Sequence, residues 1–337
     1  MKAKHIIPMI AMAISASAPA QTMGIKLENM DKTVQPGTDF YQYACGGWMK
    51  NNPLAPEYAR FGSFNTVAEE NNKRIREIIE GLAAQPQEKG SLGQKIGDLY
   101  ALRMDSVRQN KEGVKPVLAD LKRVAKVKNT QQLIDLVNQM NTEGVRFGEL
   151  WGSYIGADMM SSKDNLLEIS QGGYSIQRDY YVKDDEANKK ILDAYKEHIV
   201  RMFKLFGFSE KAARQKMKNI MKVETALARV SKSRTELRDP QANYNKMTLA
   251  EFDSKYPHLQ LEKLMNAKGI ESRYMQEMVV GQPDFFAGAD IVVAKLVPAT
   301  YRDYMEWRQI QGAAGYLNED VAQANFEFFG KVLSGRK

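Results

Sequence analysis

The sequence has little cysteine and little histidine: one cysteine and three histidines in 337 residues. Because Cys45 is the only cysteine, no disulfide bond can form within the chain, and the thiol is either buried or paired outside it. As a catalytic nucleophile Cys45 would need a histidine base. Neither His198 nor His258 lies in a sequence context that marks it as one, so a buried, small apolar side chain is the simpler interpretation.

Motifs of several enzyme classes are also missing. Zinc peptidases of the His-Glu-x-x-His type need two histidines one helical turn apart, with the glutamate as general base. Here His5, His198 and His258 are scattered, and a catalytic zinc site normally needs three protein ligands. No Gly-x-Ser-x-Gly elbow, P-loop or dinucleotide-binding glycine motif occurs. We therefore expect no catalytic residue and no metal ligand in this chain.

The sequence also contains two acidic clusters. Asp184–Glu186 and the pair Asp98 and Asp105 could suggest acid–base catalysis. Helix capping and a solvated surface explain the same residues more simply. We predict that they are structural.

No apolar run is long enough to span a bilayer, which takes about 20 residues. The N-terminus instead has a positive start with Lys2 and Lys4, followed by the short apolar run Ile6–Ala16. A small-x-small pattern then ends at Ala20, which predicts a signal peptide over residues 1–20 that is cleaved between Ala20 and Gln21. An uncleaved anchor is the alternative. Cleavage implies export to the periplasm or the extracellular space.

The charge of the chain is moderately positive. The formal net charge is +7, and loss of two lysines with the signal peptide would reduce it to +5. Ten Lys and Arg residues lie between Arg201 and Arg234, and several recur at helical spacing: Lys211, Arg214, Lys218 and Lys222. This pattern is typical of the polar face of an amphipathic helix, and we expect no nucleic-acid partner.

Apolar spacing predicts a mainly helical fold. After a flexible leader over residues 21–38, an irregular aromatic segment extends to Phe64, and a helix follows a capping box at Thr66 and Glu69. Residues 85–90 break the pattern and mark a candidate domain boundary. Helices then predominate, interrupted by a small β-hairpin within residues 147–169. Further elements are a capping box at Thr248 and Glu251, a short strand within Tyr274–Val280, a helix from Pro298 and an aromatic-rich last helix, Val321–Leu333.

The aromatic segment Asp39–Phe64 contains one arginine, Arg60, in an irregular stretch before the first long helix. A guanidinium held among aromatic side chains is well suited to bind a carboxylate through two parallel hydrogen bonds. From the residues alone, an internal salt bridge or a solvated side chain is the simpler explanation of Arg60, since exposed arginines are common.

Several ordered segments resemble the neprilysin and endothelin-converting-enzyme family of zinc metallopeptidases, N-terminal half only. They are Cys45–Trp48, which we interpret as a turn, the Arg60–Phe64 element, Gly173–Tyr181, Val223–Ala228, and Arg238–Pro240 with Tyr244–Met247. The Gly173–Tyr181 element departs from the family pattern at Ser175–Gln177. The resemblance covers nearly the whole chain after the leader.

The resemblance implies a fold with two largely helical domains around an internal chamber. Residues 39–84 would pack with the catalytic domain, and residues 85–337 would form the helical cap that limits substrate size. Arg60 would bind the C-terminal carboxylate of oligopeptide substrates, whereas a second family arginine is replaced by Ala68. A disulfide partner for Cys45 would lie outside the chain.

The resemblance also implies a zinc-dependent endopeptidase whose metal-binding motif, downstream Glu-x-x-x-Asp and substrate-binding strand are missing from these residues. We therefore expect zinc in the intact enzyme, and none bound by this chain alone. A missing C-terminal catalytic half would be its partner. Two alternatives stay open: a non-enzymatic helical module that binds peptides or a partner, and a catalytic half made as a separate polypeptide.

Overall fold

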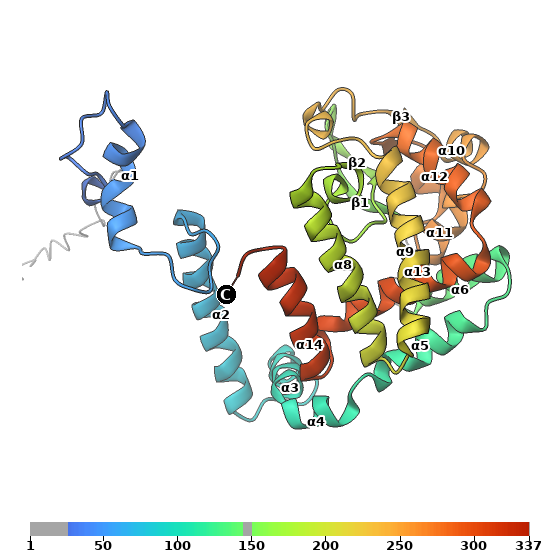
Figure 1. Cartoon of the computed structure of the whole chain (residues 1–337), viewed down its shortest axis with the longest axis horizontal. Coiled ribbons are helices and arrows are strands. Elements are labelled where there is room, and N and C mark those ends of the chain that lie inside the picture. The colour runs from blue at the N-terminus through green and yellow to red at the C-terminus, as the bar shows by residue number, and fades with distance from the viewer. Residues whose placement is uncertain (1–25, 144–149, 337) are drawn as a thin grey trace, which may run out of the picture. The chain divides into compact units, whose positions relative to one another are not determined.

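The computed structural model describes residues 26–143 and 150–336, which form two compact units divided between Phe61 and Gly62. The predicted signal peptide and its cleavage site at Ala20 and Gln21 lie outside the described residues. Helices account for most of the described chain, and one small sheet accompanies them (Figure 1). The predicted fold class, mainly helical with a small hairpin element, is confirmed.

The first unit is built on helix α1, Phe40–Asn51. Asp39 caps this helix, since its carboxylate accepts a hydrogen bond from the backbone N–H of Gln42 at 2.9 Å. The interpretation of Cys45–Trp48 as a turn is wrong, because these residues continue the helix. Only Gly46 of α1 is buried, so the helix has no apolar stripe by which the sequence could have revealed it.

The glycines of α1 have a packing role. A Cβ atom on Gly47 would lie 2.4 Å from the carbonyl oxygen of Glu28, and one on Gly46 would lie 2.8 Å from Cβ of Asp31. The short 3₁₀-helix η1, Leu27–Asn29, therefore approaches α1 more closely than any side chain would permit. Part of the segment predicted as a leader thus lies directly against α1.

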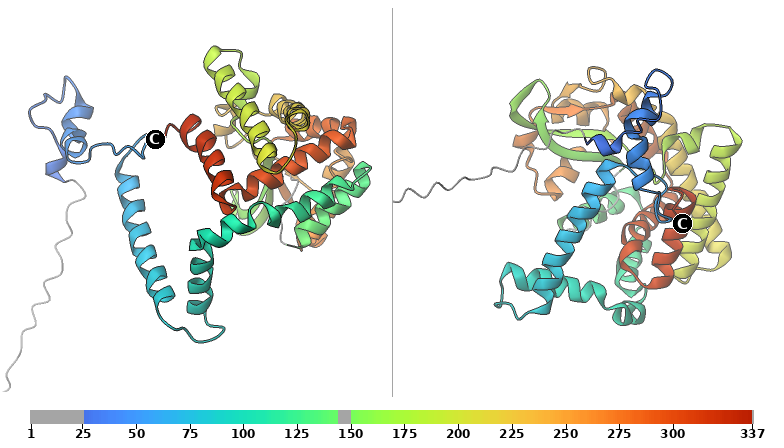
Figure 2. Two further views of the ribbon diagram at one scale, coloured as in Figure 1. Left: turned by 60° about the horizontal axis from the view of Figure 1, so that its bottom comes forward. Right: turned by 90° about the vertical axis from the view of Figure 1, so that its left-hand side faces the viewer.

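The second unit begins with helix α2, Ser63–Ala84. The predicted start at Thr66 is wrong by one turn, because the Asn65 side chain accepts a hydrogen bond from the Gly62 N–H at 3.0 Å and starts the helix earlier. Helix α3, Leu92–Met104, follows after a short loop. The two helices contact each other (Figure 2). The Tyr100 hydroxyl donates to the Glu80 carboxylate at 3.0 Å.

The remaining helices form the body of the second unit. They are α4 (Ser106–Glu112), α5 (Lys115–Ala125), α6 (Thr130–Thr142), α7 (Arg178–Val182), α8 (Glu186–Leu205), α9 (Glu210–Val230), α10 (Leu249–Lys255), α11 (Leu261–Ala267), α12 (Pro283–Lys295), α13 (Pro298–Ala313) and α14 (Glu319–Asn325). Short 3₁₀-helices lie at η2 (Glu236–Arg238), η3 (Ser272–Met275) and η4 (Ala314–Tyr316). The capping box at Thr248 and Glu251 and the helix start at Pro298 are confirmed.

The sheet has four strands in the order β1-β2-β4-β3. Strands β1 (Trp151–Asp158) and β2 (Ser161–Gln171) form the predicted antiparallel hairpin. Strand β4 (Met278–Val280) runs parallel to β2 and antiparallel to β3 (Lys246–Met247). The strand predicted within Tyr274–Val280 is therefore limited to its last three residues.

Two apolar cores hold the second unit together. One lies between the sheet and helices α6 and α10–α13, with Phe252, Phe285 and Phe286 fully buried. The other lies among α5, α8, α9, α13 and α14, with Tyr195 and Trp307 fully buried. Helices α9 and α13 contribute to both cores, and they lie side by side in the body of the unit (Figure 1).

The last predicted helix is divided in two. After α14 the chain continues as a π-helix, η5, Phe326–Val332. The ring of Phe328 stacks on His198 of α8 with 5.0 Å between the centroids, so the apolar side chains of this element find their partner within the same unit. None of the helices in the described part of the chain is both long and apolar enough to cross a membrane.

Candidate functional site

The loop after α1 carries Arg60, and aromatic residues on either side of it in the chain make ring contacts. Phe61 stacks on Trp48 of α1 with 6.1 Å between the centroids, and the Tyr58 ring meets Phe61 edge-on at 4.9 Å. A turn closed by the hydrogen bond from Tyr58 N–H to the Ala55 carbonyl at 3.0 Å precedes them. These contacts attach the loop on both sides of Arg60 to the helix.

The Arg60 side chain itself is exposed. Within residues 26–143 and 150–336 the structure assigns it no hydrogen bond and no ion pair, so the internal salt bridge considered above is not observed. A guanidinium in this state has all five N–H donors available in a fixed planar arrangement. The chemistry that it can offer is bidentate binding of a carboxylate or phosphate.

Cys45 and Ala68, which the sequence analysis names in addition to Arg60, carry no charge. Cys45 is a half-buried free thiol on α1. Ala68 lies exposed on α2 in the second unit, where its methyl group offers no contact to an anion. Of these three residues, Arg60 alone offers a group that can bind an anion.

His198 is enclosed by aromatic rings on α8. It stacks on Phe328 and meets Trp307 edge-on at 5.7 Å and Phe329 at 5.5 Å. Burial, with the nearby positive charge of Arg201, lowers the pKa of His198 from 6.5 to about 3. Its Nε2 atom is buried with no hydrogen-bond partner among the described residues. A neutral imidazole in this setting serves packing.

His258 has a different partner. Its backbone N–H donates to Asp290 Oδ1 at 2.7 Å, and its Nδ1 lies 2.8 Å from Asp290 Oδ2. Asp290 thereby ties the loop before α11 to helix α12. The two described histidines thus have different partners: aromatic rings for His198 and the Asp290 carboxylate for His258.

The residues present do not fit the zinc ion that the resemblance implies. In the part of the chain that the structure describes, no three His, Cys, Asp or Glu side chains gather closely enough to hold a metal ion. His198 faces aromatic rings and His258 faces a single carboxylate. No step of a reaction is therefore derived through zinc here.

Three residues of the two acidic clusters have structural roles of the kind predicted. Asp185 caps α8 by accepting from the N–H of Asn188, and Asp105 caps α4 by accepting from the N–H of Arg108. Asp184 pairs with Lys189 at 2.7 Å. One member of each cluster therefore caps a helix, which is the kind of structural role that the sequence predicts.

A buried carboxylate at the centre of the second unit escaped the sequence analysis. Glu224 of α9 is fully buried and accepts hydrogen bonds from the hydroxyls of Tyr181 at 2.8 Å and Tyr195 at 2.9 Å. Ser175 Oγ lies 2.6 Å from its other oxygen. Trp307 Nε1 donates to the Tyr195 hydroxyl at 2.8 Å, which extends the network to α13.

The electrostatics of this network follow from burial. Desolvation raises the pKa of Glu224, opposed by the hydrogen bonds from Ser175, Tyr181 and Tyr195. Burial and the nearby carboxylate also hold the pKa values of both tyrosines well above their usual range. The hydroxyls therefore remain protonated donors. One signal could have revealed the site: Glu224 stands on the inward face of α9, four residues after buried Ile220 and three before buried Leu227.

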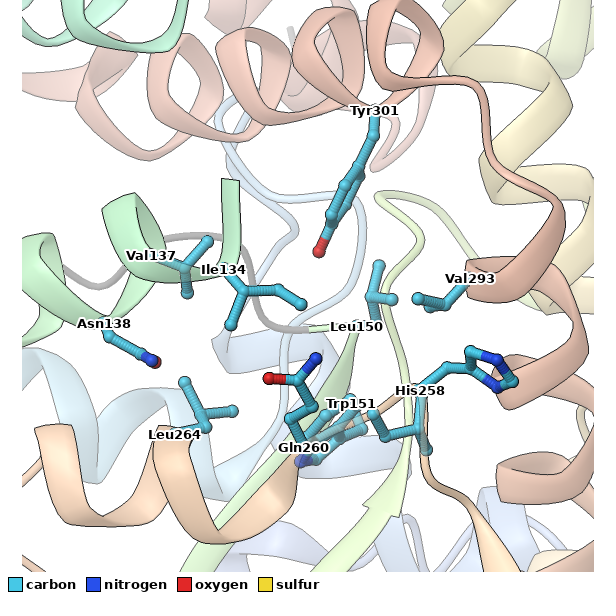
Figure 3. Close-up of a pocket in the computed structure, with 11 residues that line it drawn as sticks. Ile134, Val137, Asn138, Leu150, Trp151, His258, Gln260, Leu264, Val293 and Tyr301 are labelled. Atoms are coloured by element: carbon cyan, nitrogen blue, oxygen red, sulfur yellow. The ribbon is translucent and has the colours of Figure 1, made fainter. Parts of the chain in front are cut away.

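A small cavity lies between β1 and helices α6, α11 and α13 (Figure 3). Its volume is about 40 Å³, which suffices for a few water molecules. The Tyr301 hydroxyl and the Gln260 amide point toward its centre, whereas the His258 ring points away (Figure 3). Trp151 Nε1 is buried at its wall without a hydrogen-bond partner among the described residues. The described residues that line this cavity include no acid–base pair.

Comparison with known proteins identifies the family. The family model described as Peptidase family M13 matches residues 36–337, which is most of the chain. The chain belongs to peptidase family M13. Endothelin-converting enzyme 1 of Rattus norvegicus is 28% identical over 323 residues, covering 92% of this chain and 41% of the relative. Neprilysin-3 of Drosophila melanogaster is 26% identical over 326 residues, again covering 92% and 41%.

Solved structures agree with this assignment. The zinc metalloprotease Zmp1 of Mycobacterium tuberculosis, in complex with an inhibitor, aligns with a TM-score of 0.84 and 26% identity, covering 93% of this chain and 47% of that chain. PepO from Lactobacillus rhamnosis aligns with a TM-score of 0.72 at 16% identity, which supports the fold alone. The M13 chain described here spans less than half the length of the relatives it matches, and it corresponds to the N-terminal part of M13 peptidases.

The predicted resemblance is thereby confirmed, and two of its elements acquire a structural meaning. The Gly173–Tyr181 segment supplies Ser175 and Tyr181 to the network, and the Val223–Ala228 segment supplies Glu224. Elements separated by about fifty positions in the sequence thus meet at one buried carboxylate.

Proposed function

We propose that this chain supplies the N-terminal, substrate-admitting region of an exported M13 zinc endopeptidase that acts on oligopeptides. In this proposal Arg60 binds the C-terminal carboxylate of the peptide, and residues 85–337 form a helical cap that limits substrate size. The zinc and its ligands belong to the catalytic half of the intact enzyme. The chain alone then neither binds catalytic zinc nor hydrolyses peptides.

One observation carries the role of Arg60. Among the described residues its guanidinium has no partner, although the loop that holds it is fixed by the Trp48–Phe61 stack and the Tyr58–Phe61 contact. A fixed backbone with an unpaired guanidinium reduces the entropy lost when a carboxylate binds. A solvated arginine on a mobile surface would have no such support.

The packing of residues 39–84 with a catalytic domain is supported by the surface of α2. None of its residues is buried, yet it exposes Phe64 by 90%, Ile78 by 63% and Val67 by 56%. Helix α3 adds exposed Leu92 and Leu99. Such an apolar surface is typical of a face that another part of a protein covers.

The experiment for Arg60 needs an intact enzyme containing this N-terminal region. Kinetics are compared on paired peptides that differ only in a free or an amidated C-terminus. Arg60→Ala should lower kcat/KM for the free-carboxylate peptide roughly ten- to hundredfold, the usual effect of losing a charge-assisted hydrogen bond. The amidated peptide should be affected far less.

The matched control is Arg60→Lys, which keeps the charge but removes the planar pair of donors. It should retain part of the preference for a free C-terminus. Equal losses on both peptides with Arg60→Ala would refute carboxylate binding. The peptidase assignment itself would survive that result, because it does not rest on Arg60.

A further inference from the structure

One exposed face of helix α9 carries cations and no acidic residue. Lys211, Lys218, Lys222 and Arg229 are all exposed, and together they are called the α9 basic row. At 100° per residue they fall within an arc of about 40° around the helix axis, and the row is about 27 Å long. The uncharged Gln215 stands between them on the same face. The structure thus modifies the predicted polar face, which included Arg214 and did not extend to Arg229.

The other charged side chains of α9 are paired. Arg214 binds Glu197 at 2.9 Å, and Lys216 binds Asp303 at 2.7 Å and also contacts Glu306. Residues of the α9 basic row have no ion pair and no hydrogen bond of their side chains within the described ranges. The acidic residues of neighbouring helices therefore neutralise the sides of α9 and leave this row uncompensated.

The spacing of the row makes its charges act together. Successive members are seven, four and seven residues apart, or about 10, 6 and 10 Å along the axis. These separations are close to the Debye length of about 8 Å at physiological ionic strength, so the fields of neighbouring members overlap in the first layers of solvent. A rigid helix also holds them in one line, so that a plane touching this face meets all four.

We propose that the α9 basic row is a docking surface for an anionic lipid bilayer. The anionic headgroups of a bilayer move laterally. They can therefore gather beneath cations that are irregularly spaced along a straight helix. Each cation near such a surface strengthens binding by about fivefold, and four together by several hundredfold. The peptidase would then be concentrated at a membrane surface.

The composition of the face favours headgroups over nucleic acid. Proteins that bind single-stranded nucleic acids combine basic grooves with aromatic side chains on which bases stack. Between the members of the row stand Gln215 and Thr225, and no aromatic residue shares the face. The row therefore offers positive charge and no stacking surface. An anionic phosphate headgroup needs only the charge.

The experiment is co-sedimentation of the full chain with lipid vesicles. One set consists of phosphatidylcholine alone, and the other contains about one third phosphatidylglycerol, both measured over a range of salt concentrations. We expect binding to the anionic vesicles only, with an affinity that falls steeply as salt rises. The variant K211Q/K218Q/K222Q/R229Q should lose nearly all of this binding.

The matched control is K111Q/K122Q/K126Q/K163Q, which removes the same charge from exposed lysines elsewhere in the second unit. It should retain most of the binding, and both variants should keep the wild-type melting temperature. Equal losses in the two variants would overturn the proposal, as would an absence of vesicle binding by the wild type. Tighter binding to soluble polyphosphate or to oligonucleotides than to vesicles would also overturn it, because the partner would then not be a bilayer.

Discussion

The Tyr181 hydroxyl donates a hydrogen bond of 2.8 Å to the buried carboxylate of Glu224. This contact joins the short helix α7 to α9, and Tyr195 and Ser175 complete the coordination of the same carboxylate. A buried carboxylate is tolerated only when its oxygens are satisfied in this way. The network therefore specifies how α7, α8, α9 and α13 meet.

Replacing Glu224 should be strongly destabilising. Glu224→Ala leaves the buried hydroxyls of Tyr181 and Tyr195 without their acceptor, and we expect a loss of about 3–5 kcal/mol in the free energy of unfolding. Glu224→Gln keeps one acceptor oxygen and should cost about half as much. Urea denaturation followed by circular dichroism gives both values. Equal costs for the two variants would show that the network does not hold the carboxylate as described.

Because the pKa of Glu224 is raised, the difference in stability between wild type and Glu224→Gln depends on pH. A carboxyl whose pKa rises on folding stabilises the folded state most at low pH, and this contribution is lost as pH rises through the folded pKa. The Glu224→Gln variant has no group that titrates at this position. The difference in stability between wild type and Glu224→Gln should therefore shrink from pH 5 to pH 8.

His198 should make the second unit sensitive to acid. Its pKa falls to about 3 on folding, so the neutral form is favoured and stability is lost as pH drops below the ordinary value of 6.5. At about 1.4 kcal/mol per pH unit, the cost at pH 5 is about 2 kcal/mol. His198→Phe retains the aromatic contacts with Phe328 and Trp307, and it should flatten the decline between pH 7 and pH 5.

Denaturant titrations of wild type and His198→Phe at several pH values test this expectation. His258→Gln serves as the control, since it removes a histidine but leaves His198 in its aromatic enclosure. Its stability should decline with pH as steeply as that of the wild type. An unchanged slope in His198→Phe would contradict the assignment.

The glycines of α1 should differ from a glycine elsewhere in the same unit. Gly47→Ala places a methyl group 2.4 Å from the Glu28 carbonyl oxygen, so η1 must separate from α1. Gly37→Ala meets nothing within 4 Å and serves as the matched control. Hydrogen exchange of the α1 amides should accelerate in the Gly47 variant and remain unchanged in the Gly37 variant. Protection that is equal in both variants would show that the close approach is unimportant.

Much of the second unit could be predicted from its sequence because its helices are long and carry apolar side chains at helical spacing. Helix α8, the hairpin of β1 and β2, and the start of α13 at Pro298 all follow such local signals. Helix α1 could not be predicted in this way. Its stability comes from the Asp39 cap and from close backbone packing at Gly47, and neither produces an apolar stripe.

The candidate site also has one part that the sequence predicts and another that it does not. The family resemblance points to Arg60 within its aromatic segment, and the structure adds the ring contacts of Tyr58 and Phe61 beside it. Glu224 was missed, because its partners Ser175, Tyr181 and Tyr195 are 29 to 49 positions away in the sequence. A contact of that kind depends on tertiary packing, which single-residue patterns do not record.

In the proposed function this chain contributes substrate binding, and the zinc chemistry of the intact M13 peptidase belongs to residues outside it. The most direct measurement is the zinc content of the purified chain after equilibrium with micromolar zinc, together with its hydrolysis of a fluorogenic peptide with and without chelator. We predict no stoichiometric zinc and no chelator-sensitive hydrolysis. One zinc ion per chain accompanied by chelator-sensitive hydrolysis would contradict the account.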